Sequence, residues 1–284
     1  MDINKLKQLV DEVYPYIDSI GLTGLGETFL YQDLVEAAEY IRSKSEGIII
    51  STSINAHLKN SPEIARTLVE LIDTIQISID GIGDVYNQVR LGGDYTFFLK
   101  NLKEIVQAAS ETDTNVMFNM VLVKENYHQM TEMVGLAHAM GVKYLNMTTI
   151  NLASVTGLER AYYNLFFTDE YRNELSKAVA YAQQLPDLEF IPPNPEAPIG
   201  FNQCGFPWGH YYISWDGFMP PCCAKPFPLE KSFGNVFDKP FLAVLNSLEF
   251  RKFREQWFKN ETPEFCEKCH QIDLKSWPDQ PQVV

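Results

Sequence analysis

Four cysteines near the end of the sequence have a spacing that could hold a metal. Cys204 is followed after twelve residues by Gly217, and Gly217 is followed after four residues by Cys222, while Cys266 and Cys269 form a close Cys-x2-Cys pair. Thiolates gathered from distant segments are the ligands that zinc, copper(I) and iron-sulfur clusters prefer. The sequence therefore predicts a metal site formed by Cys204, Cys222, Cys266 and Cys269.

Three interpretations of these thiols stay open on spacing alone. A structural zinc ion usually takes its ligands as two short pairs, whereas Cys204 and Cys222 lie eighteen positions apart, so the spacing favours an iron-sulfur cluster over zinc. The third interpretation is a set of buried thiols that act as small hydrophobic residues. Cys223 follows Cys222 directly and should point elsewhere in an extended segment, so we treat it as a spare thiol.

Polar residues also follow the first predicted strand. Gly24 and Gly26 let a ligand approach the backbone, and the carboxylate of Glu27 beside them could bind an ammonium group. Phe29 stands where the dinucleotide-binding motif G-x-G-x-x-G needs its third glycine, so a dinucleotide pyrophosphate is not the expected ligand. The alternative is a plain tight turn in which Glu27 caps a helix.

Two later strands carry polar residues as well. Ser78 and Asp80, directly before Gly81, offer a hydroxyl and a carboxylate that could bind sugar hydroxyls. The alternative is that Asp80 caps the next turn. Asn119 interrupts an apolar strand over residues 116–123 and should face a polar interior site, unless its amide is satisfied within the core.

These residues need a scaffold that brings strand ends together. Amphipathic stretches alternate with short apolar runs over residues 5–150, which is typical of repeated β-α units around a parallel sheet. We expect strands at residues 17–23, 47–53, 74–80, 115–123 and 144–149, and helices at residues 29–43, 61–72, 95–109 and 127–140. The chain opens with a helix at residues 4–13, where a β-α repeat should open with a strand, so a first strand is expected to be absent.

A second domain is expected near the end of the chain. The proline-rich stretch 191–198 suits neither a helix nor a central strand. Beyond it, residues 210–215 and 218–220 flank Asp216-Gly217, which is a hairpin signal, and residues 241–258 predict one amphipathic helix. We therefore predict an α/β fold: a partial (β/α) barrel of parallel strands at residues 1–190 and a small cysteine-rich domain at residues 191–284.

The composition limits the partners. A chain of 284 residues with 45% hydrophobic content can bury a large core, and its net charge of −14 repels nucleic acid and anionic membrane surfaces. No apolar run approaches the roughly 20 residues that cross a bilayer, and the first residues lack the features of a signal peptide. Five cysteines, all after position 200, suit metal binding in a reducing compartment. We expect a cytoplasmic protein.

Together, these motifs resemble the radical S-adenosylmethionine (SAM) superfamily, in its branch with a SPASM or twitch C-terminal domain. The stretch 24–27 resembles the glycine-glycine-glutamate motif that holds the SAM amino group, and the stretch 78–81 resembles the ribose-contacting strand. The cysteine spacing falls within the family pattern Cys-x(9-15)-Gly-x4-Cys, followed by a further pair. The resemblance covers nearly the whole chain and implies SAM contacts at Gly24, Gly26, Glu27, Ser78, Asp80, Arg90 and Asn119.

The resemblance also implies cofactors and partners. Four cysteines resemble the twitch form, which carries one auxiliary [4Fe-4S] cluster, and the barrel of the family binds SAM. A small-molecule or peptide substrate and an electron-donor protein are the implied partners. The family's Cys-x3-Cys-x2-Cys loop, which binds the cluster that cleaves SAM, is absent from the sequence, so we expect an N-terminal truncation.

Three functional hypotheses follow from these observations. The first is a radical SAM oxidoreductase, or an enzyme that modifies a peptide or metabolite through a 5′-deoxyadenosyl radical once the missing loop is present. The second is a non-catalytic family member that keeps the auxiliary cluster and binds a substrate or a partner protein. The third is a structural zinc module on a β-α scaffold.

Overall fold

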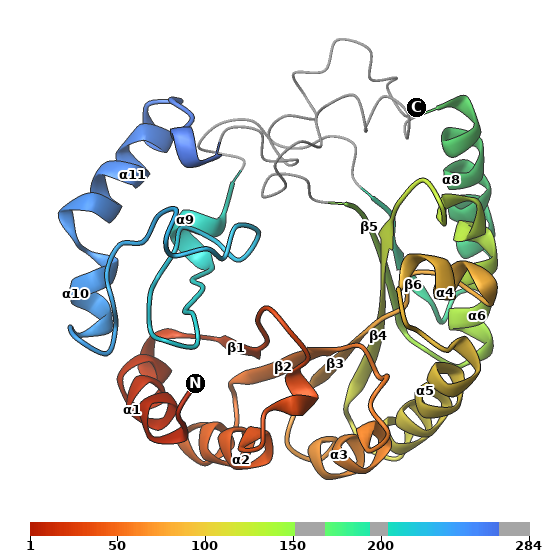
Figure 1. The fold of residues 1–284 in the computed structure, drawn as a ribbon, viewed down its shortest axis with the longest axis horizontal. Coiled ribbons are helices and arrows are strands. Elements are labelled where there is room, and N and C mark those ends of the chain that lie inside the picture. Colours follow the sequence, from red (N-terminus) through yellow and green to blue (C-terminus); the bar gives the residue numbers. More distant parts are fainter. Residues whose placement is uncertain (151–167, 194–203, 267–284) are drawn as a thin grey trace. The chain divides into compact units, whose positions relative to one another are not determined.

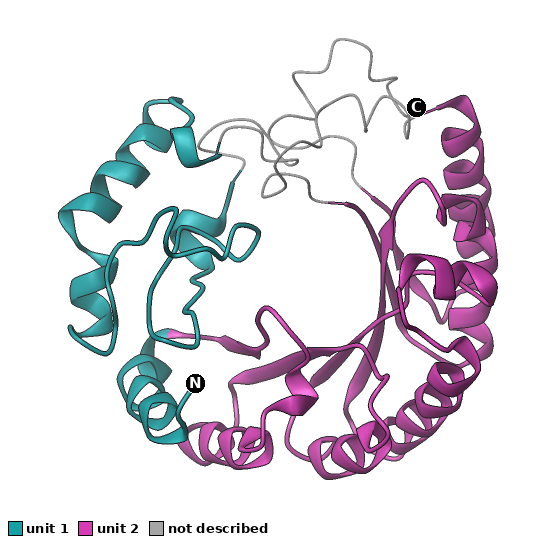
Figure 2. Ribbon diagram, viewed as in Figure 1, with its two compact units in different colours: residues 1–16, 151–159, 194–284 teal, residues 17–150, 160–193 magenta. Residues whose placement is uncertain are grey.

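The computed structural model describes residues 1–150, 168–193 and 204–266 (Figure 1). Contacts divide the chain into two compact units, which Figure 2 colours separately. Unit 1 comprises residues 1–16, 151–159 and 194–284, and unit 2 comprises residues 17–150 and 160–193. The sheet predicted from the sequence therefore lies in unit 2, and the described cysteines lie in unit 1.

Unit 2 is built on a six-stranded sheet in which each strand runs parallel to its neighbours and the strand order follows the chain. The strands are β1 (Ser19–Leu22), β2 (Ile49–Ile54), β3 (Thr74–Ser78), β4 (Asn115–Leu122), β5 (Tyr144–Thr149) and β6 (Glu189–Ile191). The first five confirm the predicted strands. The sixth was not predicted, because three residues before a pair of prolines carry too little pattern to indicate an edge strand.

Helices cover one face of this sheet (Figure 1). They are α2 (Leu34–Lys44), α3 (Ser61–Leu68), α5 (Tyr95–Ser110), α6 (Met130–Ala139) and α8 (Asp169–Ala182), with a shorter α4 (Asp84–Val89). The predicted helices at 29–43 and 127–140 each begin with a separate 3-10 turn, η2 (Thr28–Leu30) before α2 and η3 (Tyr127–Gln129) before α6. Strand residues that face the helices, such as Ile77, Phe118 and Leu145, are completely buried. Unit 2 is thus the α/β partial barrel that the sequence predicts.

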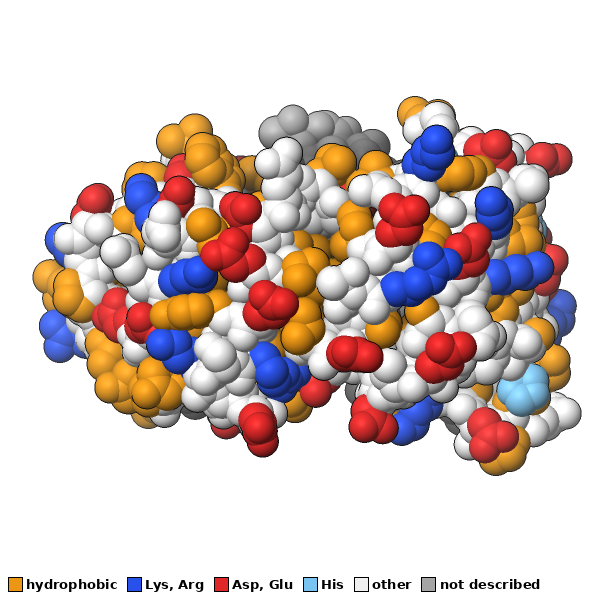
Figure 3. All heavy atoms as spheres, turned by 90° about the horizontal axis from the view of Figure 1, so that it is seen from below, with side chains coloured by type: hydrophobic (Ala, Val, Ile, Leu, Met, Phe, Trp, Pro, Cys, Tyr) orange, Lys and Arg blue, Asp and Glu red, His pale blue; other side chains and the backbone are white. Residues whose placement is uncertain are grey.

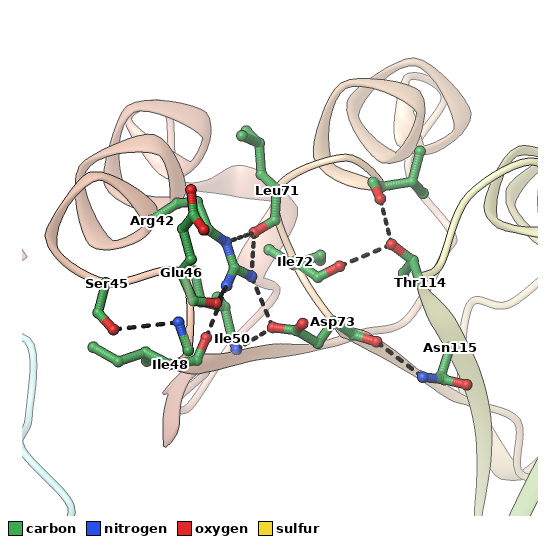
Figure 4. Close-up of polar contacts among 12 residues, drawn as sticks. Arg42, Ser45, Glu46, Ile48, Ile50, Leu71, Ile72, Asp73, Thr114 and Asn115 are labelled. Carbon is green, nitrogen blue, oxygen red and sulfur yellow. Dashed lines mark hydrogen bonds and ion pairs between the residues drawn. The ribbon is translucent and has the colours of Figure 1, made fainter. Parts of the chain in front are cut away.

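A network around Arg42 closes the amino-terminal end of the sheet (Figure 4). The guanidinium donates hydrogen bonds of 2.8 to 3.1 Å to the carbonyls of Glu46, Ile48 and Leu71 and to Asp73 Oδ2. The same oxygen of Asp73 accepts the backbone N–H of Ile50 at 2.7 Å. Backbone carbonyls outside the strands need hydrogen-bond donors. Arg42 supplies them and so holds the loop between α2 and β2 beside the loop between α3 and β3.

Unit 1 joins the first helix to the C-terminal region. Its helices are α1 (Ile3–Val13), α9 (Phe206–Gly209), α10 (Phe241–Leu245) and α11 (Leu248–Phe258), with the 3-10 turns η1 (Tyr14–Tyr16) and η5 (Glu264–Cys266). Glu12 Oε1 accepts the backbone N–H of Phe241 at 2.6 Å, and the Lys5 ammonium lies 4.8 Å from the centre of the Phe237 ring. The predicted domain boundary near residue 190 stays a prediction, and helix α1, although predicted within the barrel domain, groups by contacts with the C-terminal region.

Two local predictions for unit 1 were wrong. The single helix expected over residues 241–258 is two helices, because Ser247 begins a new one and its hydroxyl accepts the backbone N–H of Phe250 at 3.2 Å. The turn at residues 214–217 forms, but Phe218 makes an antiparallel bridge with Asn235 instead of continuing a hairpin with residues 210–215. Within the described ranges, no helix combines the length and apolar character needed to cross a membrane.

Candidate functional site

The loop after β1 orients a carboxylate through backbone amides. Gly26 has a φ of +118°, a conformation that favours glycine. Glu27 Oε1 accepts the N–H of Phe29 at 3.2 Å, and Glu27 Oε2 accepts the N–H of Asn55 at 2.8 Å. Glu27 therefore caps η2, as the alternative interpretation expected. Each carboxylate oxygen has a second lone pair, so the capped group can still accept from an ammonium.

Asp80 lies in a buried ion pair at the end of β3. Its side chain accepts from Arg90 at 3.0 Å (Nε) and 2.8 Å (Nη2) through Oδ2, and from the N–H of Val121 at 2.8 Å through Oδ1. The residue is 8% exposed. Gly81 follows with a φ of +153°, and a Cβ there would lie 2.8 Å from the Tyr86 nitrogen. The structure thus brings the predicted residues Asp80 and Arg90 together, as partners of each other.

Asn126 fixes this corner of the sheet and was missed by the sequence analysis. It is completely buried, and its side-chain nitrogen donates to the carbonyls of Asp80 at 3.0 Å and Val121 at 2.9 Å. Its side-chain oxygen accepts the N–H of Val123 at 2.8 Å. The only sequence signal was an asparagine shortly after a strand, which many turns share.

A row of polar side chains crosses three neighbouring strands. Ser78, Asn119 and Asn146 are register partners on β3, β4 and β5, and the Asn146 amide donates to Asn119 Oδ1 at 2.6 Å. Successive strand residues point to opposite faces, and the residues before them face the helices. The row therefore lies on the face turned away from the helices, which we call the inner face. Asn119 is satisfied in part by Asn146, which the sequence analysis did not identify.

The next row toward the strand starts is mostly polar and is also uncharged. Ser53, Gln76, Met117 and Tyr144 are register partners across β2 to β5, and the Gln76 amide donates to Ser53 Oγ at 3.1 Å. The described inner-face positions of β2 to β5 carry hydroxyls, amides and a few apolar groups, and none of them is a charged side chain. Such a surface offers hydrogen bonds to neutral polar groups.

His57 and Tyr86 form an aromatic cluster beside the Asp80–Arg90 pair. His57 Nε2 accepts the N–H of Asp94 at 3.3 Å, and His57 Nδ1 lies 3.4 Å from the Tyr86 hydroxyl. Burial raises the pKa of Tyr86 to about 12, with the Arg90 charge opposing and the Asp80 charge adding to that rise. The phenol therefore stays protonated at neutral pH.

The cysteines lie in unit 1. Cys204 and Cys222 lie close enough for their thiolates to interact, and burial raises the pKa of both thiols. The N–H of Phe206 opposes this rise at Cys204, as do those of Lys225 and Ala224 at Cys222. In iron-sulfur sites, the cysteine thiolates accept hydrogen bonds from backbone N–H groups of this kind. These two residues fit a thiolate-bound cluster.

Gly217 gives the cysteine spacing a structural reason. Its φ is +91°, and a Cβ at this position would lie 2.3 Å from the Phe237 ring and 2.5 Å from Asn235 Oδ1. Only glycine fits this turn, because a collision of this size requires the ring to move. The turn fixes where the chain reverses before Cys222.

Of the two other predicted ligands, the structure describes one. Cys266 ends η5, whereas Cys269 lies outside the described residues. Cys223 is exposed, as expected for a spare thiol. Within the described ranges, no group of three or more His, Cys, Asp or Glu side chains is arranged to hold a metal ion. The structure therefore brings together Cys204 and Cys222, and the four-cysteine ligand set stays a prediction.

Two protein-family models match the chain and show the family to which it belongs. The model of the radical SAM superfamily matches residues 1–137, and the model of SPASM, an iron-sulfur cluster-binding domain, matches residues 204–270. The chain belongs to the radical SAM superfamily, in its SPASM branch. The predicted cofactors of this branch, SAM and [4Fe-4S] clusters, are confirmed at the level of the family.

Solved structures share the radical SAM fold. Streptococcus suis SuiB bound to S-adenosylmethionine is 18% identical over 89% of this chain and 61% of SuiB, with a TM-score of 0.69. SuiB bound to the precursor peptide SuiA is 16% identical over 96% of this chain and 64% of SuiB, with a TM-score of 0.69. Native anSMEcpe with bound AdoMet and Kp18Cys peptide is 15% identical over 95% of this chain and 78% of that protein, with a TM-score of 0.63.

These likenesses concern part of a longer relative. The chain spans 61% to 65% of the length of the SuiB structures. No curated protein sequence matches it. The similarity in sequence is low enough that the solved structures show the fold alone.

Proposed function

We propose that this chain is the SAM-binding and auxiliary-cluster part of a radical SAM enzyme that modifies a peptide. The observation that carries the proposal is that Cys204 and Cys222, which interact electrostatically and have backbone N–H groups near their sulfurs, both lie in the stretch that matches an iron-sulfur cluster-binding domain. Thiolates from Cys204, Cys222, Cys266 and Cys269 would hold one auxiliary [4Fe-4S] cluster. Residues 1–190 would form the barrel domain, and residues 191–284 the cluster domain.

The strand-end residues of unit 2 supply the proposed SAM contacts. Glu27 would accept the SAM ammonium with the lone pairs that its two amide donors leave open. Ser78, Asn119 and the Asp80–Arg90 pair would contact the rest of the molecule, with Gly24 and Gly26 allowing close approach. When bound, SAM supplies a 5′-deoxyadenosyl radical after reductive cleavage. This sequence contains no Cys-x3-Cys-x2-Cys loop, and that cleavage requires such a loop to be present.

A peptide is the proposed substrate class. The solved relatives SuiB and anSMEcpe include structures with bound peptides. The inner face of unit 2 offers uncharged hydroxyl and amide groups, which suit the neutral amides of a peptide better than a phosphate or a carboxylate. An electron-donor protein would complete the set of partners.

The negative net charge of the chain is the reason that no nucleic-acid partner is proposed. The net charge is −14, and on the face drawn in Figure 3 basic side chains are interspersed with acidic ones. Phosphate backbones bind to continuous basic surfaces. We keep the cytoplasm as the expected compartment, because clustered thiols are preserved in a reducing environment.

Anaerobic reconstitution tests the cluster. The chain is incubated with iron and sulfide, and iron and acid-labile sulfide are counted per chain. We expect about four irons per wild-type chain, as one cluster bound by four thiolates requires. Cys222→Ala should lose most of that iron, whereas Cys223→Ala, a change at the neighbouring exposed thiol, should keep it.

The outcomes separate the three hypotheses. Iron uptake with SAM cleavage, once the missing Cys-x3-Cys-x2-Cys loop is present, supports the enzyme. Iron uptake without cleavage under the same conditions supports a non-catalytic member. A chain that binds zinc and shows no thiolate-to-iron absorbance supports the zinc module and contradicts the proposal.

A further inference from the structure

Lys225 is a largely buried cation close to the proposed cluster. Its side chain is 12% exposed, although lysine is rarely buried without partners. The ammonium donates to the carbonyl of Phe265 at 2.8 Å and lies 4.2 Å from the centre of the Phe265 ring. Glu230 provides a carboxylate at 3.5 Å. Each of these residues belongs to unit 1.

These contacts connect two cysteine-bearing turns. Lys225 follows Cys222 by three residues, and Phe265 directly precedes Cys266. The hydrogen bond from Lys225 to Phe265 spans 40 positions of sequence. It therefore ties the turn that carries Cys222 to the 3-10 turn that ends at Cys266. No regular strand pairing links these two turns within the described ranges.

The charge of Lys225 also acts on the Cys222 sulfur. Burial raises the pKa of the Cys222 thiol, and the backbone N–H and the ammonium of Lys225 both oppose that rise. Glu230 compensates the lysine charge only in part, because its side chain is 47% exposed and its oxygen lies 3.5 Å away. The ammonium therefore also acts on the Cys222 sulfur.

A cluster bound by four thiolates carries a net negative charge. Its reduction adds one more electron, which a nearby cation favours, and the net charge and burial around such a cluster set its reduction potential. An ammonium that is largely shielded from water changes the reduction potential more strongly than an exposed one, because electrostatic interactions are stronger away from water.

We propose that Lys225 is a positioning residue for the auxiliary cluster: it holds the Cys222 and Cys266 turns together and raises the reduction potential of the cluster through its positive charge. This inference rests on the proposed function, since it requires the cluster to bind. It concerns a residue that is not a ligand, and it was not predicted from the sequence, because a lysine after a cysteine has no distinctive spacing.

A redox titration of the reconstituted protein, followed by electron paramagnetic resonance, tests the role of the charge. Lys225→Met should shift the midpoint potential of the cluster to a more negative value. Lys225→Arg should stay near the wild type, because it keeps a cation. The control is Lys231→Met, which removes a lysine that also lies near aromatic rings, 5.8 Å from the centre of Phe233, and should leave the potential unchanged.

A second variant keeps the test decisive if Lys225→Met loses iron. Glu230→Gln removes the compensating carboxylate and should shift the potential to a more positive value with iron content retained. Loss of iron from Lys225→Met, with iron kept by Lys225→Arg, supports the positioning role. The inference is overturned if Lys225→Met keeps both iron and the wild-type potential, or if Glu230→Gln causes no shift. A wild-type chain that takes up no iron overturns the proposed function as well, so the two failures are distinguishable.

Discussion

Units 1 and 2 use polar side chains in different ways. In unit 2, polar groups that could bind ligands also have protein partners: Glu27 accepts two backbone N–H groups, and Asp80 is bound by Arg90 and Val121. In unit 1, the sulfurs of Cys204 and Cys222 are approached by backbone N–H groups and by each other. The carboxylates of unit 2 thus have protein partners, whereas the thiols of unit 1 are proposed metal ligands.

Regular structure follows the same division. Six paired strands and the Arg42 network hold unit 2 together. In the described part of unit 1, the strand pairing is one isolated bridge, and the core is aromatic: the Phe233 and Phe250 rings stack at 4.0 Å, and Trp257 is completely buried. We therefore expect unit 2 to fold from its own contacts, and the cysteine turns of unit 1 to depend on the proposed cluster.

Removal of the metal should produce the largest effect and should act on unit 1. Small thiolate metal sites contribute on the order of 10 kcal/mol of binding free energy that is also folding free energy. After anaerobic chelation of the reconstituted protein, we expect much faster amide hydrogen exchange over residues 204–225 and 264–266. Exchange in β2 to β5 should stay as slow as before.

The cysteine variants supply the control for this measurement. Cys223→Ala should show the same chelation response as the wild type, because Cys223 is exposed and is not a proposed ligand. Cys222→Ala should resemble the chelated protein before any chelator is added. Equal increases of exchange in both units would contradict the comparison.

Removal of Arg42 should produce the next largest effect and should act on unit 2. Arg42→Ala leaves the carbonyls of Leu71 and Ile48 without their donor, and it leaves Asp73 without its cation. Orphaned polar groups of this kind cost about 1 to 3 kcal/mol each, so we expect the free energy of unfolding to fall by about 3 kcal/mol. Urea unfolding followed by far-ultraviolet circular dichroism measures this change, with and without the metal.

A matched arginine tests whether the network, rather than charge alone, is responsible. Arg66 pairs with Glu104 at 2.8 Å, but the two side chains are 54% and 37% exposed. Exposed pairs of this kind contribute less than about 1 kcal/mol. A destabilisation by Arg66→Ala as large as that by Arg42→Ala would show that the Arg42 network has no special role.

The two units also differ in how well the sequence predicts them. Buried parallel strands and amphipathic helices have strong periodic patterns, so β1 to β5 were predicted. Strand β6 was missed because three residues beside prolines have no period, and the break between α10 and α11 was missed because Ser247 fits a helix surface as well as a helix start. In unit 1, where turns dominate, local pattern carries less information.

The candidate sites show the same limit at the level of residues. The cysteines and the glycine-glycine-glutamate motif have a fixed spacing, so the sequence alone can single them out as candidates. The pairing of Asp80 with Arg90 depends on a loop that returns over the strand end, which spacing alone does not reveal. Asn126, Asn146 and Lys225 were missed because their partners lie on other elements, and common residue types give no signal until those elements are placed.

A change at Tyr86 should produce the smallest effect, and it separates pH dependence from metal dependence. Burial raises the pKa of Tyr86 to about 12, above its value in the unfolded chain, so the folded state holds this proton more tightly. The contribution of this pKa shift to the free energy of unfolding is fully present below about pH 10 and is lost as the pH rises toward 12. The slope is about 1.4 kcal/mol per pH unit in that window. Tyr86→Phe should reduce the slope of urea unfolding measured at pH 9.5 to 11 by this contribution, and the buried Tyr171, whose pKa is also raised, should supply the slope that remains.

The same slope should appear with and without metal, because Tyr86 belongs to unit 2 and its neighbours His57, Arg90 and Asp80 do too. Tyr16→Phe is the control, since that side chain is 63% exposed and its loss should leave the slope unchanged. If the alkaline loss of stability disappears on metal removal instead, the titrating groups belong to unit 1. Unit 2 would then depend on the cofactor of unit 1, and the independence of the two units would be wrong.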